Sequence, residues 1–381
     1  MTNEQNSKTK LIADTLREEA VSGCFPSGRF PSEAQVVRRF GVARQTAVKA
    51  IEILVRENIV VRRRGAGSFV AKHLRKATGV IGIIVPGLAY AEIFAPICSS
   101  LASILSDRGY SLQLADFSDD NPAALADKAI QVAEDFVEKG VDGVTFYPIE
   151  FLPNSAEIND SIASRLSAAD IPVVLLDGDL SAPSKRSLYD IVSVDNFVGG
   201  YAIADHLLRQ GVQRIAFLMR NHWANSVKNR MYGVSAACVA AGLGWSEANI
   251  FRSEPDDARK VAALMKSARR PQAIVCGNDT AAMKLQATIH ALGYGIPEDV
   301  LVAGFDDVQN ARFATPPITT VRQPLGDIAQ TLVETLFARR RHPDGAPHEV
   351  VLHAAFVARE STNAARLKWW PDKKTSRKII K

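Results

Sequence analysis

The sequence has little cysteine, and no pattern of cysteine and histidine in it is spaced to hold a metal. Its four cysteines, Cys24, Cys98, Cys238 and Cys276, lie far apart, and none forms a CxxC pair. Scattered thiols of this kind are typical of proteins from a reducing compartment. We therefore expect neither a disulfide framework nor a metal, and no other cofactor is indicated.

Long apolar runs are also missing. The N-terminus, MTNEQNSKTK, is polar and lacks the apolar core of a signal peptide. The most apolar stretch, Val80–Leu105, is interrupted by Pro86, Gly87, Glu92 and Pro96, so it fails the roughly 18-residue requirement for a membrane span. These features predict a cytoplasmic protein with no membrane partner.

Catalytic signatures are missing as well. The chain has no nucleophile elbow, no metal-ligand spacing and no phosphate-binding loop. An enzyme of the α/β class remains an alternative that turnover of a bound ligand would support, but we expect no catalytic residue.

Charge is abundant and unevenly distributed. Residues 1–78 hold 15 Lys and Arg against 7 Asp and Glu, residues 79–363 hold 24 against 33, and residues 364–381 hold 7 against 1. A basic head on an acidic body favours a head that meets a polyanion. The alternative is a bias that serves solubility alone.

The head, residues 8–70, begins with three predicted helices. Gly23 offers a C-cap to the first helix, and Ser32 with Gln35 forms a capping box that opens the second. The third is predicted over Arg44–Glu57. The apolar side of the first helix consists of residues at helical spacing: Leu11, Ile12, Leu16 and Ala20.

The third helix separates into two faces at 100° per residue. One face is apolar and consists of Ala47, Ala50, Ile51 and Leu54. The other offers a guanidinium, an amide and a small apolar group, which are the groups that read base edges in the major groove; it consists of Arg44, Gln45, Val48 and Lys49. A solvated amphipathic face is the alternative.

The segment VVRRRGAGSFV then predicts a two-stranded hairpin. Its arginines, Arg62–Arg64, are suited to neutralise phosphates. Its glycines, Gly65 and Gly67, allow the backbone to approach phosphate or the minor groove. The hairpin is therefore interpreted as the wing of a winged helix.

These motifs resemble a GntR-type winged helix. The family pattern is matched by PSE at 31–33, GVARQTA at 41–47 and GAGSFV at 65–70. Ala43 replaces the usual serine N-cap of the third helix, a loss of roughly 1 kcal/mol, and Ala34 and Val48 replace common arginines. The resemblance and the helix face together indicate these DNA contacts: Ser32, Arg44, Gln45, Thr46, Lys49, Arg62, Arg63, Arg64, Gly65 and Gly67.

The body alternates short β-rich runs with helical stretches, an order that predicts parallel sheets with helices on both faces. A first set contains Val80–Val85, and a second set begins at Ile191–Val194. The comparable runs IGIIVP at 81–86 and RIAFLM at 214–219 suggest two Rossmann-like lobes, in which the loops at the carboxyl ends of strands face a ligand crevice. The predicted fold class is thus α/β, with an N-terminal winged helix-turn-helix and a two-lobed body.

Polar residues follow several of these strands. Asp177, Asn278 and Asp306 each come directly after an apolar run, and Arg230 opens a helical stretch. Carboxylates, an amide and an arginine beside aromatic rings are the groups that bind sugars. The alternative for each residue taken alone is a cap or a turn, and Asp279 is predicted to be an N-cap.

The whole body resembles the LacI-type effector domain and periplasmic sugar-binding proteins. The resemblance is carried by VDGV at 141–144, IPVVLLD at 171–177, the run 192–218, the run 276–307, ATPPITTVRQPL at 314–325 and ARESTN at 358–363. It implies ligand contacts at Phe94, Asp177, Arg230, Asn278, Asp306 and Gln323. Tyr90 and Trp223 are added as aromatic candidates. Gly178 stands where arginine is frequent in sugar binders, so a non-sugar effector stays possible.

The expected division is a head at 1–71, a linker at 72–78, a body at 79–363 and a basic tail at 364–381, for which disorder is favoured over packing on the body. The linker leaves no room for the hinge helix of LacI-type regulators, and the combination resembles the arabinose-responsive repressors. The prediction is a homodimeric regulator of transcription, with operator DNA as one partner and a mono- or disaccharide as the other. A sugar-binding transport protein is the alternative.

Overall fold

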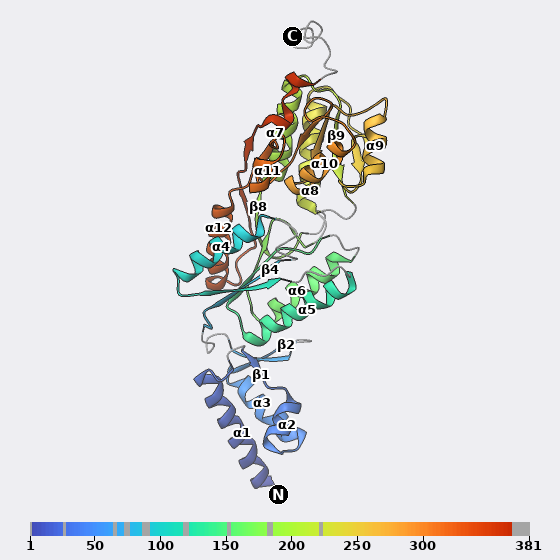
Figure 1. Ribbon diagram of the computed structural model, residues 1–381. Coiled ribbons are helices and arrows are strands. Elements are labelled where there is room, and N and C mark those ends of the chain that lie inside the picture. Colours follow the sequence, from blue (N-terminus) through green and yellow to red (C-terminus); the bar gives the residue numbers. More distant parts are fainter. Residues whose placement is uncertain are drawn as a thin grey trace.

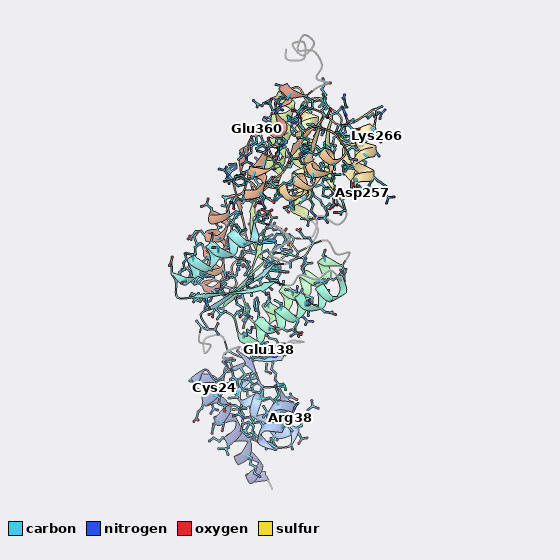
Figure 2. The ribbon with its side chains drawn as sticks, in the orientation of Figure 1. Cys24, Arg38, Glu138, Asp257, Lys266 and Glu360 are labelled. Atoms are coloured by element: carbon cyan, nitrogen blue, oxygen red, sulfur yellow. The ribbon has the colours of Figure 1, made fainter. Side chains whose placement is uncertain are left out.

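The computed structural model describes residues 2–25, 28–63, 67–71, 77–85, 92–116, 122–150, 154–180, 186–220 and 224–367. Figure 1 shows three units in a row: the N-terminal head, a first lobe in the middle and a second lobe at the far end. Glu360, near the end of the described chain, lies on the second lobe, at the end of the molecule opposite Arg38 of the head (Figure 2).

The head confirms the predicted helices and hairpin. It contains α1 (Thr2–Ser22), β1 (Arg29–Phe30), α2 (Glu33–Phe40), α3 (Arg44–Arg56), β2 (Val60–Arg63) and β3 (Gly67–Val70). The strands form an antiparallel sheet in the order β1-β3-β2, so β1 is a third strand that the sequence did not predict.

The core of the head follows the predicted apolar stripes with one exception. Leu16, Ile51 and Leu54 are fully buried between α1 and α3, whereas Leu11 is 67% exposed. The capping box at the start of α2 is present. Ala43 precedes α3 without a side-chain cap, as its methyl group dictates.

The first lobe is a six-stranded parallel sheet with helices on both faces (Figure 1). Its strand order is β14-β8-β7-β6-β4-β5. The strands are β4 (Val80–Val85), β5 (Ser111–Asp116), β6 (Gly143–Phe146), β7 (Val173–Leu176), β8 (Asp190–Val194) and β14 (Glu349–Leu352). The helices are α4 (Phe94–Ser106), α5 (Pro122–Lys139), α6 (Ser155–Ala168) and α12 (Leu325–Arg341).

Alternate residues of β4 point to opposite faces of this sheet, as the strand period requires. Ile81 and Ile83 join the core beneath α4 and α12, and Ile84 joins the core beneath α5 and α6. The prediction that Ile191–Val194 begins the second set of strands is wrong, because β8 pairs with β7 and β14 in the first sheet.

The second lobe has a four-stranded parallel sheet in the order β10-β9-β11-β12. Its strands are β9 (Ile215–Met219), β10 (Ile250–Arg252), β11 (Ala273–Cys276) and β12 (Leu301–Ala303). Its helices are α7 (Asn196–Arg209), α8 (Asn225–Ala240), η2 (Glu247–Asn249), α9 (Ala258–Lys266), α10 (Asp279–Ala291) and α11 (Gln309–Phe313). An antiparallel pair, β13 (Thr320–Arg322) and β15 (Ala355–Val357), accompanies it.

The chain passes between the lobes after β8, between β13 and α12, and between β14 and β15. The short helices η3 (Glu360–Thr362) and η4 (Ala364–Arg366) follow. Ala364 and Leu367 are buried in the core of the second lobe, so the body extends beyond the expected boundary at 363; residues 368–381 lie outside the described part. Of the described helices, none is both long and apolar enough to span a membrane.

Candidate functional site

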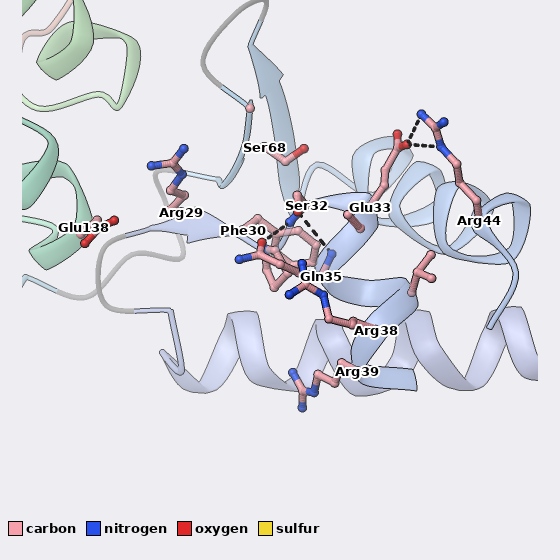
Figure 3. Close-up of a pocket in the computed structure, with 14 residues that line it drawn as sticks. Arg29, Phe30, Ser32, Glu33, Gln35, Arg38, Arg39, Arg44, Ser68 and Glu138 are labelled. Carbon is pink, nitrogen blue, oxygen red and sulfur yellow. Dashed lines mark hydrogen bonds and ion pairs between the residues drawn. The ribbon is translucent and has the colours of Figure 1, made fainter. Parts of the chain in front are cut away.

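A groove of about 1380 Å³ runs across the head between α2, the start of α3 and the wing (Figure 3). Four arginines line it, Arg29, Arg38, Arg39 and Arg44, and Glu138 from the end of α5 lies at its far side. The predicted recognition helix therefore borders a cationic groove. The sequence motifs did not single out Arg29 and Arg38. The run RRF at 38–40, close to the capping box, could have indicated a cationic surface there.

Most of the predicted contacts on α3 are accessible. The Arg44 side chain is 83% exposed and lies 3.3 Å from Glu33 Oε2, while the Arg62 guanidinium lies 3.4 Å from Glu33 Oε1. Gln45 and Lys49 are exposed beside Arg44. One acidic residue thus holds the helix arginine and the wing arginine together.

The structure revises three of the remaining head predictions. Thr46 is only 5% exposed and lies on the buried side of α3, so its side chain is not presented to DNA. Ser32 is exposed, but its hydroxyl accepts from Gln35 N in the capping box. Arg63 Nη1 donates to main-chain oxygens of α6 in the first lobe, so this arginine points away from the groove.

The wing turn is only partly described. Arg64 and Gly65 lie outside the described residues. Gly67 has φ +103°, and a Cβ there would have no neighbour within 4 Å. Glycine at 67 is therefore required by the backbone conformation and not by crowding.

Between the lobes, four predicted residues form one hydrogen-bonded network with Asn196. Asn196 Nδ2 donates to Asp177 Oδ1 at 3.3 Å, and Arg230 Nε donates to Asn196 Oδ1 at 2.8 Å. The Arg230 guanidinium lies 3.4 Å from Asp306 Oδ1, and this carboxylate accepts from Gln323 Nε2 at 2.7 Å. The network joins the end of β7 in the first lobe to α7 and α8 in the second.

Arg230 is held rigidly at the centre of this network. It is 5% exposed, donates to Gly277 O at 2.6 Å, and lies 3.7 Å from the centre of the Phe305 ring. The close approach of α7 and α8 positions it, because a Cβ on Gly200 would lie 2.0 Å from Arg230 O. Such a fixed guanidinium is suited to bidentate recognition of ligand oxygens.

The two flanking carboxylates occupy unusual backbone positions. Asp177 has φ +68° and Asp306 has φ +111°. Burial raises the pKa of Asp306 to about 6, against the opposing effects of Arg230 and Gln323. Backbone strain and a raised pKa are typical of functional sites.

On the side of the first lobe, Tyr147 and Glu150 lie within electrostatic range of Asp177 and Arg230, and the buried Phe94 packs against Tyr147. We use the term cleft for the region that these residues share with the network. The Phe94 and Tyr147 rings meet edge to face with centroids 4.8 Å apart, and Tyr147 Oη donates to Glu150 Oε2 at 3.1 Å. Burial, together with the charge of Asp177, raises the pKa of Glu150 to about 8. Sequence reasoning missed Tyr147 and Glu150, although both follow closely after the motif VDGV at 141–144.

The structure assigns the residues at the start of α10 differently from the prediction. Asn278, and not Asp279, is the N-cap, and its Oδ1 accepts from Ala281 N at 2.8 Å. Asp279 is fully buried and accepts from Thr320 Oγ1 and from Val308 N. The other predicted aromatics, Tyr90 and Trp223, lie outside the described residues.

The side chains of the cleft are suited to hydroxyl groups. Because its pKa is raised to about 8, the Glu150 carboxyl is mostly protonated at neutral pH, and the charged groups that act on it are Asp177, Arg230 and Lys228. Hydroxyl groups can donate to carboxylates and accept from a guanidinium. Across the described ranges, no cluster of His, Cys, Asp or Glu is arranged to hold a metal ion.

Two family models match the chain. Residues 8–70 match the model of bacterial regulatory proteins of the gntR family, and residues 204–362 match the periplasmic binding protein-like domain. These ranges cover the winged head and most of the second lobe.

Curated relatives are named as transcriptional repressors. The chain is 26% identical, over 94% of its length and 98% of the relative's, to an arabinose metabolism transcriptional repressor from Halalkalibacterium halodurans. It is 28% identical, over 77% of its length and 84% of the relative's, to the HTH-type transcriptional repressor PurR from Mannheimia succiniciproducens.

A solved structure described as a transcriptional regulator CelR–cellobiose complex is similar in fold. It has a TM-score of 0.64 and 22% identity over 91% of this chain and 99% of that one. The chain therefore joins a domain of the gntR family of bacterial regulatory proteins to a periplasmic-binding-protein-like domain.

Proposed function

We propose that the protein is a transcriptional repressor that a small neutral sugar releases from its operator. The observation that carries the proposal is the network from Asp177 through Asn196 and Arg230 to Asp306, which spans both lobes. A ligand bonded to this network contacts two rigid bodies at once. It can therefore favour one lobe arrangement over another by its differential affinity for the two.

The partners follow from the same parts. A homodimer in the cytoplasm would place two winged helices on a pseudo-palindromic operator, because two-fold protein symmetry mirrors that of DNA. Among the structural neighbours, one is described with bound ribose and one as complexed with D-xylulofuranose. These titles support a mono- or disaccharide as the effector class here, and no catalytic role is proposed.

The test is fluorescence anisotropy on a labelled fragment of the protein's own promoter, with a panel of mono- and disaccharides added in turn. We expect a salt-sensitive specific complex that one neutral sugar weakens. Absence of a specific complex would reject the regulator assignment. Release by a non-sugar metabolite only, with no sugar active, would reject the effector class.

A further inference from the structure

The wing contacts the first lobe directly. Arg63 Nη1 donates to Ala168 O at 2.5 Å and to Ser167 O at 3.2 Å, and the same guanidinium pairs with Asp170. Phe69 of β3 is 2% exposed and belongs to the buried cluster of α5 and α6. We call these five residues the wing–α6 contact.

The chemistry of this contact favours arginine. The last carbonyl groups of a helix have no partner within the helix and carry the negative end of its dipole, and Arg63 supplies fixed donors to two of them. Asp170 has φ +60°, a conformation that Asp and Asn tolerate better than most residues. The Arg63 and Asp170 side chains are 23% and 27% exposed, so solvent screens their attraction only in part.

Strand β3 is shared between two hydrophobic cores. Phe69 packs with the first lobe, whereas its neighbour Val70 packs in the core of the head. Alternate residues of a strand face opposite sides. Two adjacent residues of β3 therefore lie in different cores, and the strand links the head to the first lobe. The Arg63 guanidinium lies 5.5 Å from the centre of the Phe69 ring, which joins the polar and apolar parts of the contact.

The other end of α6 is tied to the effector cleft. The buried side chain of Asn159 accepts from Ile149 N at 2.7 Å and donates to Ile149 O at 2.9 Å. Ile149 directly precedes Glu150, which lies in the cleft. Helix α6 is therefore hydrogen-bonded to the cleft loop through Asn159 and holds the wing at its C-terminal end.

We infer that α6 transmits the state of the effector cleft to the DNA-binding head through the wing–α6 contact, and that Arg63 positions the wing and does not neutralise a phosphate. This inference rests on the proposed function. A change of the cleft loop moves α6 as a rigid body, and the wing and the recognition helix packed behind it move with α6.

The experiment compares DNA affinity with and without a saturating sugar in three variants: Asp170→Asn, Arg63→Gln and Arg62→Gln. Asparagine keeps the tolerance for positive φ at 170, so the fold is retained. For Asp170→Asn and Arg63→Gln we expect the ratio of the two affinities to fall close to unity, from a coupling typically of 5- to 150-fold. For the control Arg62→Gln, on the same wing, we expect weaker DNA binding with the ratio unchanged.

An unchanged ratio in Asp170→Asn would overturn the inference. So would an Arg63→Gln variant that behaves like Arg62→Gln, with a shallower salt dependence and a normal response, because Arg63 would then be a phosphate contact. Hydrogen exchange at Phe69 and Val70 provides a readout that needs no sugar. Exchange at these two amides should accelerate about tenfold in Asp170→Asn if the contact stabilises β3. Exchange as slow as in the wild type would overturn the inference, even if no sugar acted on the wild type.

Discussion

Replacing Asp306 by Asn tests the effector site without removing a large side chain. The amide oxygen at 306 can still accept from Gln323 Nε2, a bond of 2.7 Å in the wild type. What is lost is the charge opposite Arg230, 3.4 Å away, and the ionised acceptor for a ligand hydroxyl. Hydrogen bonds to charged groups contribute about 1.5–3 kcal/mol, so effector affinity should fall roughly 10- to 150-fold.

The fold should tolerate this change. An acid whose pKa is raised to about 6 is less favourable when ionised in the folded state than in the unfolded state. Wild-type stability therefore decreases as pH rises from about 4 to 6, and a neutral amide avoids that cost at pH 7. Asn also accepts the positive φ at this position.

The assay is isothermal titration calorimetry with the active sugar, alongside thermal unfolding and DNA binding without ligand. We expect weak sugar binding, an unchanged or higher melting temperature at pH 7, and unchanged DNA affinity. Wild-type sugar affinity in the variant would refute the placement of Asp306 in the site. A large drop in melting temperature would show that the carboxylate is mainly structural.

Three further predictions concern the head and the pH response. Arg44→Ala should cost roughly 1–3 kcal/mol of specific DNA binding and relax one base position, measured by anisotropy on single-base operator variants; equal loss on all variants would contradict a base contact. Ala43→Ser supplies the missing cap of α3 and should stabilise the protein by about 1 kcal/mol, seen in chemical denaturation, whereas an unchanged midpoint would show that the cap is satisfied otherwise. Sugar affinity should fall as pH drops below about 6, because Asp306 then becomes protonated; a flat titration profile between pH 5 and 8 would speak against this carboxylate as the acceptor.

The strands and helices of the body were predictable because apolar runs and helical periodicity are local signals. The boundaries of β4 match the expected run Val80–Val85 to the residue. The sheet that β8 joins was not predictable in this way. The order of strands along the chain does not show where the chain crosses from one lobe to the other. The pairing of β8 with β7 and β14 assigns this strand to the first lobe.

The same distinction between local signals and contacts of distant segments separates the predicted site residues from one that was missed. Asp177, Arg230 and Asp306 were found because strand ends converge in this fold, and Gln323 was implied by the family resemblance. The structure joins all four. Asn196 was missed, because its role as a bridge depends on an α7–α8 approach that two glycines permit.

The wing shows how contacts override residue type. Three consecutive arginines look equivalent in sequence, yet Arg62 pairs with Glu33 of the head and Arg63 reaches the end of α6. Strand alternation alone predicts that the side chains of adjacent residues point to opposite faces. Which of them meets another domain depends on packing between segments more than 100 residues apart.

The sharing of β3 between two cores has a consequence for modularity. A head fragment cut after residue 71 would carry Phe69 and Arg63 without the surface that buries them. The same holds for a chimera that places this head on a foreign sensor. A successful exchange of heads would have to transplant the end of α6 as well. The segment that must be exchanged as one unit therefore extends past the junction between the domains.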